Sequence, residues 1–182
     1  MIYRFQSPAV FLIGPTASGK TDTAIKLAEK HPFEIISVDS AMVFKDMNIG
    51  TCKPSNQDLE RIPHHLIDII KPDTKFDVGL FVNYVESAVK NIIKNNKIPL
   101  FVGGTMMFHK VLFNGIHDFP RDENLREEIN LVKKNQGYEH LLDELKQLDP
   151  ETFQLIDIKN PRRVERALEI IKLTNTKLSL LK

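Results

Sequence analysis

The chain has 182 residues, of which 42% are hydrophobic and 27% are charged, and its formal net charge is +1. These values are typical of a globular protein, and no apolar run reaches the roughly 18 residues that predict a membrane span. The balanced charge excludes a uniformly basic nucleic-acid-binding protein, so any basic surplus has to be local. Residues 161–177 hold such a surplus, with five basic and two acidic side chains.

The cysteine count and the N-terminal residues bound the cellular setting. Cys52 is the only cysteine, which excludes an internal disulfide and a cysteine-rich zinc site. The N-terminal residues lead directly into an apolar run and lack the pattern of a signal peptide. We therefore expect a cytoplasmic protein that does not associate with membranes.

A glycine loop follows the first predicted strand. Residues 9–13 are a short apolar run, and residues 14–21 read Gly-Pro-Thr-Ala-Ser-Gly-Lys-Thr, which fits the pattern G-x-x-x-x-G-K-[ST]. A helix is predicted over Thr21–Lys30. Loop N–H groups and a helix N-terminus attract an anion, Lys20 adds a positive charge, and the Thr21 hydroxyl suits Mg²⁺. The loop therefore predicts a diphosphate or polyphosphate ligand but does not name the reaction.

The second predicted strand, Glu34–Val38, ends at Asp39. Ligands of open α/β sheets bind outside the carboxyl ends of the strands, so Asp39 is expected near the phosphate loop. Two interpretations remain open for this carboxylate. It is either a helix cap or Mg²⁺ ligand, or the general base of a reaction.

Two further strands are predicted in the first 115 residues. Residues 63–69 are expected to be a short strand whose adjacent histidines point to opposite faces. A helix capped by Asp77 precedes the strand Ile98–Val102. After that strand, Gly103 and Gly104 would allow close backbone approach to a ligand. Thr105 either caps the helix Met106–Asn114 or contacts the ligand.

From residue 116 the pattern changes to helices alone. Asp122, Asp149-Pro150 and Asn160-Pro161 are predicted helix starts, and residues 177–182 still have helical character. The sequence therefore predicts an α/β fold, with a P-loop-NTPase-like parallel sheet (1–115) covered by helices on both faces, followed by a small all-helical subdomain (116–182). Three or four strands are fewer than doubly wound sheets usually have, so we expect a chain that is cut short.

Two enzyme classes fit these features. A P-loop kinase or NTPase acting on a small molecule needs an acidic residue for Mg²⁺ and an arginine-rich lid. Asp39 would supply the first, and Arg121, Arg126, Arg162 and Arg163 the second. The other class is a transferase that uses the loop to hold a diphosphate leaving group. A nucleotide-gated binding module has no specific feature in its favour.

Six motifs in order carry a resemblance to a known family. They are Gly14–Thr21, Ile36–Ser40, Met47–Pro54, Pro63–Ile69, Leu100–Thr105 and Arg162–Glu169. The series resembles the tRNA dimethylallyltransferase (tRNA isopentenyltransferase) family over most of residues 9–178. Members of that family transfer a dimethylallyl group from dimethylallyl diphosphate to N6 of adenosine 37, beside the anticodon.

The resemblance implies a role for each matching residue. The diphosphate and Mg²⁺ would be held by Gly14, Thr16, Ala17, Ser18, Gly19, Lys20 and Thr21, with Thr21 as the metal ligand. The catalytic residues would be Asp39 as general base, Thr105 and Arg126. Contacts to the tRNA anticodon stem-loop would come from Asp39, Ser40, Ala41, Met42, Thr105, Arg126, Arg162, Arg163, Val164, Glu165 and Arg166. Full-length members are expected to be monomers.

The chain departs from the family pattern at four positions. Met42 stands where glutamine is common, and its thioether lacks the amide that would hydrogen-bond the tRNA bases. Phe44 and Phe108 replace tyrosines but keep their stacking surface. Cys52 replaces an alanine. Members are commonly about 300 residues long, so the last core strands are expected to be absent here.

Overall fold

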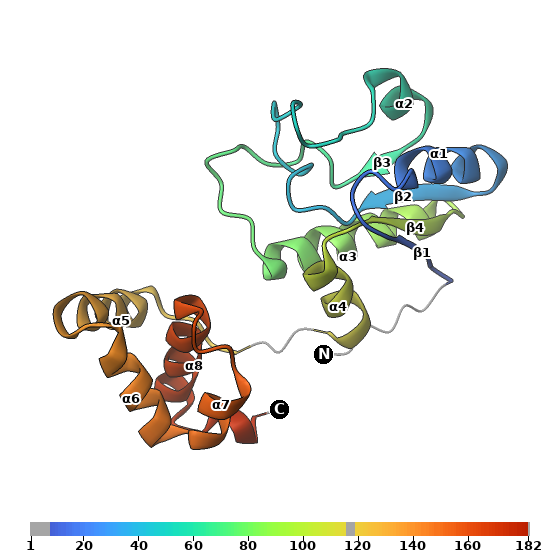
Figure 1. The fold of residues 1–182 in the computed structure, drawn as a ribbon. Helices are drawn as coiled ribbons and strands as arrows, with labels where there is room; N and C mark the ends of the chain where they lie inside the picture. The colour runs from blue at the N-terminus through green and yellow to red at the C-terminus, as the bar shows by residue number, and fades with distance from the viewer. Residues whose placement is uncertain (1–7, 116–118, 182) are drawn as a thin grey trace. The chain divides into compact units, whose positions relative to one another are not determined.

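The computed structural model describes residues 8–115 and 119–181 and divides into two compact units, residues 1–116 and 117–182. Figure 1 shows the sheet of the first unit and the helices of the second. None of the helices in these described stretches is long and apolar enough to cross a membrane.

A parallel four-stranded sheet forms the centre of the first unit, with its strands in the order β1, β4, β2, β3. The strands are β1 (Val10–Ile13), β2 (Phe33–Ser37), β3 (His64–His65) and β4 (Ile98–Gly103). Because β4 lies between β1 and β2, Ile13 pairs with Gly103 and Ser37 pairs with Val102. The segments that follow these three strands therefore meet at one edge of the sheet.

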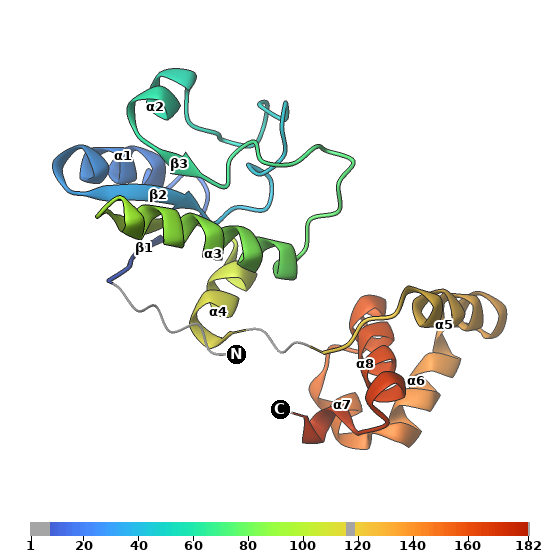
Figure 2. The same cartoon turned by 180° about the vertical axis from the view of Figure 1, so that it is seen from behind.

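Helices cover both faces of this sheet, which confirms the predicted α/β fold (Figure 2). Alternate strand residues face opposite sides. Ile35 and Leu100 pack against α1, whereas Ile36 and Phe101 pack against the opposite layer. The helices of this unit are α1 (Lys20–Lys30), α2 (Asn56–Arg61), α3 (Val78–Lys94) and α4 (Met106–Asn114).

One cap and one aromatic residue of this unit can be compared with the expectations from the sequence. The Asp77 carboxylate accepts a hydrogen bond from Leu80 N at 2.9 Å and starts α3 as predicted. Phe108 of α4 is buried and stacks on Phe81 of α3, with ring centroids 4.0 Å apart. The phenylalanine at position 108 therefore keeps its stacking role within the core.

The strand predicted over residues 63–69 is wrong beyond its first residues. Only His64 and His65 pair with β2. Leu66 and Asp68 have φ angles of 64° and 53°, which is the left-handed region, and a strand cannot continue through it. The backbone instead turns back, and Asp68 N donates to the Met42 carbonyl at 3.0 Å.

The second unit packs its helices around a separate apolar core that includes Ile129, Leu141 and Leu168. The helices are α5 (Glu123–Gln136), α6 (Tyr138–Leu148), α7 (Pro150–Leu155) and α8 (Pro161–Thr174). All three predicted caps accept hydrogen bonds from helix N–H groups: Asp122 from Leu125, Asp149 from Thr152, and Asn160 from Arg162.

The helical character predicted for residues 177–182 is only partly right. Asn175 has φ 48° and ends α8 in a left-handed conformation. A short 3₁₀ turn, η1 (Leu178–Leu180), follows. Lys182 lies outside the described residues.

Asp149 holds η1 onto the start of α7. The residue is 0% exposed, and its carboxylate accepts hydrogen bonds from the backbone N–H and hydroxyl groups of both Thr152 and Ser179, at 2.6–3.0 Å. Burial alone would raise the pKa of Asp149, but these hydrogen bonds outweigh it and lower the pKa to about 2. Since the folded pKa lies below the unfolded value, this carboxylate stabilises the fold above about pH 4. That stabilisation is lost as the pH falls toward 2.

We predict that Asp149→Asn lowers the free energy of unfolding at pH 7 by about 2 kcal/mol, since the charged acceptor of four donors is lost. Urea unfolding followed by circular dichroism at pH 7 and pH 3 measures the effect. The difference from the wild-type chain should shrink at pH 3. Asp143→Asn, at an exposed position of α6, is the matched control. Equal unfolding curves for the two variants would contradict the role of Asp149.

Candidate functional site

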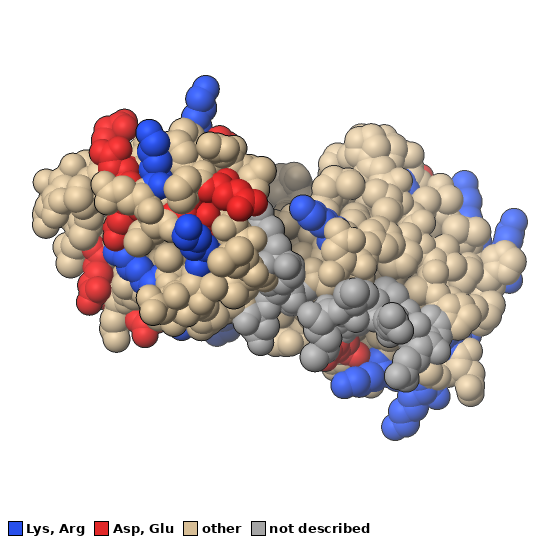
Figure 3. Space-filling model, turned by 90° about the horizontal axis from the view of Figure 1, so that it is seen from below, with Lys and Arg blue, Asp and Glu red and all other residues tan. Residues whose placement is uncertain are grey.

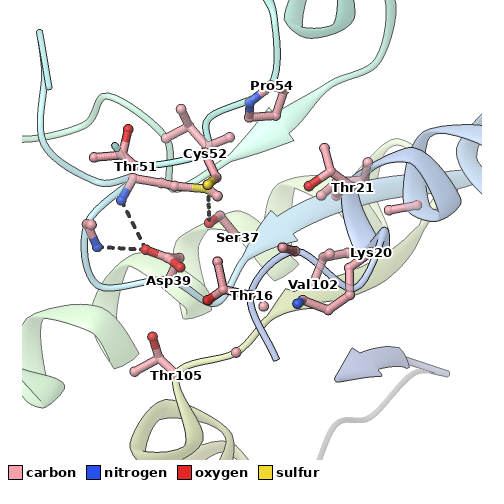
Figure 4. Close-up of a pocket in the computed structure, with 18 of the residues that line it drawn as sticks. Thr16, Lys20, Thr21, Ser37, Asp39, Thr51, Cys52, Pro54, Val102 and Thr105 are labelled. Carbon is pink, nitrogen blue, oxygen red and sulfur yellow. Dashed lines mark hydrogen bonds between the residues drawn. The ribbon is translucent and has the colours of Figure 1, made fainter. Parts of the chain in front are cut away.

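A cavity of about 640 Å³ lies at the sheet edge where β1, β2 and β4 end (Figure 4). Its wall comes from four stretches of the first unit, with further side chains from α1, β2, β3 and the turn after β3. The stretches are Thr16–Asp22, residues 37 and 39–42, residues 50–52 and 54, and Val102–Thr105, and the further side chains are Ala24, Ile35, His64 and Ile67.

The glycine loop presents its backbone to this cavity. Ala17 and Gly19 have φ angles of 64° and 77°, so the chain turns twice through the left-handed region before α1 begins. Gly19 occupies the N-cap position and supplies no side-chain cap, which leaves the first N–H groups of α1 free to bind an anion. Lys20 donates to the Pro15 carbonyl and lies 3.4 Å from Ser18 Oγ. The geometry is that of a phosphate-binding loop.

Asp39 follows β2 and faces the same cavity. Its Oδ1 atom accepts hydrogen bonds from Ala41 N at 2.8 Å and Met42 N at 3.2 Å (Figure 4). These bonds hold residues 39–42 in a turn and fix the carboxylate plane. No helix begins within residues 39–55, so the helix-cap interpretation is wrong, and Oδ1 closes a turn instead. The second oxygen accepts no hydrogen bond from the described residues.

Thr105 lies at the N-cap position of α4, yet its side chain makes no cap hydrogen bond. The backbone of Thr105, and not its side chain, therefore caps α4. The other predicted role of the side chain, contact with a ligand, stays a prediction. The hydroxyl remains available to the cavity that Thr105 lines. Figure 4 shows Thr105, Asp39 and Thr16 around the same space.

Gly103 brings the end of β4 against the chain itself. A Cβ at this position would lie 2.1 Å from the Val38 carbonyl oxygen, and one at Gly104 would lie 2.9 Å from the Gly14 oxygen. The sequence predicted that these glycines let a ligand approach. In the structure, the small size of these glycines allows close packing of backbone against backbone. This packing brings the ends of β2 and β4 close to the phosphate loop.

Several cavity residues were not predicted as site residues from the sequence. Thr51, Cys52 and Pro54 form part of one wall, and His64 and Ile67 contribute from β3 and the turn beyond it. The signal was present, because these residues lie in two of the six ordered motifs. Met42, the unusual residue, accepts a hydrogen bond from Ser37 Oγ at Sδ, 3.6 Å away.

The donor set fits a magnesium ion that arrives with a diphosphate. Among the described residues, no cluster of three or more His, Cys, Asp or Glu side chains is placed to hold a metal ion. Mg²⁺ typically takes one or two protein oxygens and completes its shell with phosphate and water. Thr21 and Asp39 both bring oxygen atoms to the cavity.

The predicted arginines lie in the second unit, and one buried carboxylate holds two of them. Glu169 is 2% exposed and accepts hydrogen bonds from Arg126 Nε at 2.9 Å and Arg166 Nη1 at 2.7 Å. Arg166 also donates to the Pro120 and Phe119 carbonyls. Burial acts to raise the pKa of Glu169, but the hydrogen bonds from Arg166, Asp122 N and Arg126 lower it overall.

The remaining predicted tRNA contacts on α8 differ in exposure. Arg162 and Arg163 are exposed at the start of the helix, and Arg163 lies 3.6 Å from Asp157. Glu165 pairs with Lys133 at 2.5 Å. Val164 is fully buried in the core of the unit, so its side chain is not exposed for the predicted tRNA contact. The spacing of the arginines did not reveal that α8 turns Arg162 and Arg166 to different surroundings.

A glycine loop with the phosphate-binding pattern and a carboxylate line one cavity, at the end of the parallel sheet where open α/β proteins bind their ligands. A family model described as IPP transferase matches residues 42–182, and one described as isopentenyl transferase matches residues 8–72. The chain belongs to this family, which confirms the resemblance seen in its motifs.

Individual relatives agree with the family models. The tRNA dimethylallyltransferases of Psychrobacter sp. and Legionella pneumophila (strain Corby) are 45% and 47% identical to the chain over 93% and 92% of its length. The chain spans 47% and 54% of these two proteins, or about half the length of the curated relatives that it matches.

Solved structures show the same fold. The tRNA isopentenylpyrophosphate transferase of Bacillus halodurans is 38% identical, with a TM-score of 0.58 over 92% of this chain and 56% of that one. A eukaryotic dimethylallyltransferase acting on tRNA is 30% identical, with a TM-score of 0.82 over 94% of this chain and 43% of that one.

We predict that Arg166→Ala lowers the free energy of unfolding by about 3 kcal/mol, because it leaves the buried Glu169 carboxylate short of a partner. Arg162→Ala, four residues earlier and exposed, should change it by less than about 0.5 kcal/mol. Urea unfolding of the two variants and the wild-type chain compares them directly. A stable Arg166→Ala variant would show that this arginine is free for another role.

Proposed function

We propose that the chain carries the donor site of a tRNA dimethylallyltransferase. The reaction moves a dimethylallyl group from its diphosphate to N6 of adenosine 37 in the anticodon stem-loop of tRNA. One observation carries the proposal: the phosphate loop and the Asp39 carboxylate line a single cavity. The diphosphate of the donor and the proton acceptor for the adenosine amine would therefore share this cavity.

The reaction requires both the phosphate loop and the carboxylate. A base within a stack cannot present N6 to an electrophile, so the adenosine has to leave the stack and enter the cavity. The N6 lone pair forms a bond to C1 of the prenyl group as the bond from C1 to the diphosphate oxygen breaks. The amine gives up a proton, for which Asp39 is the acceptor.

The fixed position of Asp39 suits it to this task. Its Oδ1 atom is engaged by two backbone N–H groups, and the carboxylate cannot rotate without breaking them. The second oxygen is then the proton acceptor, held by the protein before the substrate arrives. A positioned general base of this kind typically contributes ~10²–10⁴-fold.

Growing charge on the leaving diphosphate needs fixed positive groups. The N–H groups at the start of α1 and the Lys20 ammonium are the donors on this side of the cavity. Bound Mg²⁺, held by Thr21 and the diphosphate, would supply further charge neutralisation. Thr105, with its uncommitted hydroxyl, is placed to hydrogen-bond the reacting groups.

The division of labour between the units is part of the proposal. The first unit binds the donor, and the second contacts tRNA through cations such as Arg162 and Arg163. Lys and Arg side chains are interspersed with Asp and Glu on the described part of the face in Figure 3. Affinity for the stem-loop would then depend on a few positioned cations and on shape. We further propose that the full-length protein is a cytoplasmic monomer.

We predict that the chain, with Mg²⁺, binds dimethylallyl diphosphate in competition with inorganic pyrophosphate, and that it does not turn over ATP. Labelled dimethylallyl diphosphate with bulk tRNA, and ATP in a parallel reaction, make the measurement. Bound label should be displaced by inorganic pyrophosphate and should be lost in Lys20→Ala, which is the control. Steady phosphate release from ATP that Lys20→Ala abolishes would instead identify a P-loop kinase or NTPase.

We predict that Asp39→Asn, made in a full-length version of the protein, keeps donor binding and loses about 10²-fold or more of the transfer rate. Asparagine still offers an oxygen to the Ala41 and Met42 N–H groups, so the turn should persist. Single-turnover transfer and donor titration separate the two effects. Asp46→Asn, in an exposed left-handed position that asparagine tolerates, is the control. Transfer at the wild-type rate would leave Asp39 with its turn-forming role alone.

A further inference from the structure

One nearly buried lysine closes the loop that forms the cavity wall opposite the phosphate loop. The side chain of Lys53 is 5% exposed. Its Nζ atom donates to the Phe44 carbonyl at 2.7 Å, to Asn48 Oδ1 at 3.1 Å and to Asp68 Oδ1 at 2.6 Å. An ammonium has three protons, so all its donors are used.

The three acceptors come from different parts of the chain. Phe44 and Asn48 lie earlier in the loop of residues 44–54, and Asp68 lies in the turn after β3. The backbone joins the same two segments, with Ile69 N donating to Val43 O at 2.9 Å and Lys45 N donating to Ile70 O at 2.8 Å. Lys53 therefore fastens the far end of the loop to a region that the backbone already ties to its start.

This loop has no regular secondary structure between Phe44 and Pro54 to hold its shape. Yet the residues on either side of Lys53 face the cavity: Gly50, Thr51, Cys52 and Pro54. Cys52 has φ 55°, a left-handed conformation that costs free energy unless its surroundings impose it. Fixed contacts lie on both sides of it: the Lys53 hydrogen bonds, and Thr51 Oγ1 donating to the Met47 carbonyl at 2.7 Å.

Lys53 is not itself a phosphate ligand. Its ammonium has no proton left to donate, and its side chain is nearly covered. We infer that Lys53 is a positioning residue, which acts by holding the 50–54 wall in place through Asp68, Asn48 and Phe44. The inference rests on the proposed donor site, with the diphosphate at the phosphate loop and the rest of the donor against the 50–54 wall.

The two ends of a prenyl diphosphate should therefore respond differently to loss of Lys53. The diphosphate end is held by Thr16–Thr21, which Lys53 does not touch. The prenyl end needs the opposite wall to be closed against water. Inorganic pyrophosphate, which has only the first end, is thus an internal control for the integrity of the phosphate loop.

The test compares Lys53→Met, which removes all three hydrogen bonds, with Lys45→Met, the same change at an exposed position of the same loop. Hydrogen exchange of the ligand-free chain should rise in residues 44–54 and 68–70 of the Lys53 variant and stay unchanged in β1, β2 and β4. Its affinity for dimethylallyl diphosphate should fall roughly tenfold, and that for inorganic pyrophosphate by less than about twofold.

A second variant keeps the test decisive if Lys53→Met fails to fold. Asp68→Asn retains an acceptor oxygen but loses its charge, so it should give the same pattern in weaker form. Unchanged exchange in both variants, or an equal loss of both ligands, overturns the inference. A third outcome separates the two claims. If hydrogen exchange of the loop rises in the variants, but the wild-type chain binds pyrophosphate and not dimethylallyl diphosphate, the positioning role of Lys53 is supported and the proposed function is overturned.

Discussion

The close approach of β4 to β2 is the constraint on which the rest of the first unit depends. Gly103 packs its backbone against the Val38 carbonyl, where even a methyl group would lie 2.1 Å from the oxygen. This contact lies where β4 runs between β1 and β2, since Ile13 and Ser37 pair with its last residues. The phosphate loop, Asp39 and Thr105 then meet at one edge, although they are far apart in the sequence.

Hydrogen bonds of charged side chains fix the groups around the cavity. Asp39 is oriented by the N–H groups of Ala41 and Met42, and the opposite wall is fastened by Lys53. In both cases a charged side chain meets fixed partners in a partly covered setting, where such hydrogen bonds are stronger than in water. Because these groups are already in position, substrate binding does not have to arrange them.

The second unit uses its charges in two ways. Glu169 draws Arg126 and Arg166 together, and Arg166 also binds the carbonyls of Phe119 and Pro120, so these cations secure the start of the unit to α8. Arg162 and Arg163 stay exposed at the N-terminus of that helix. Arginines that are close in the sequence therefore include both structural and solvent-facing side chains, and only the packing of α8 shows which are which.

Local sequence determined much of this protein. The phosphate loop, its flanking strand and helix, the caps at Asp77, Asp122, Asp149 and Asn160, and the change to helices near residue 116 all follow from short-range patterns, because turns, caps and apolar periodicity depend on neighbouring residues. Six ordered motifs also identified the family. Tertiary structure alone decided the rest: the turn that ends β3 after His65, the burial of Val164, the hydrogen bond from Arg126 to the buried Glu169 and the hydrogen bond from Lys53 to Asp68. Each depends on partners more distant in the chain or on which face of an element is covered, and those are properties that folding, rather than neighbouring sequence, defines.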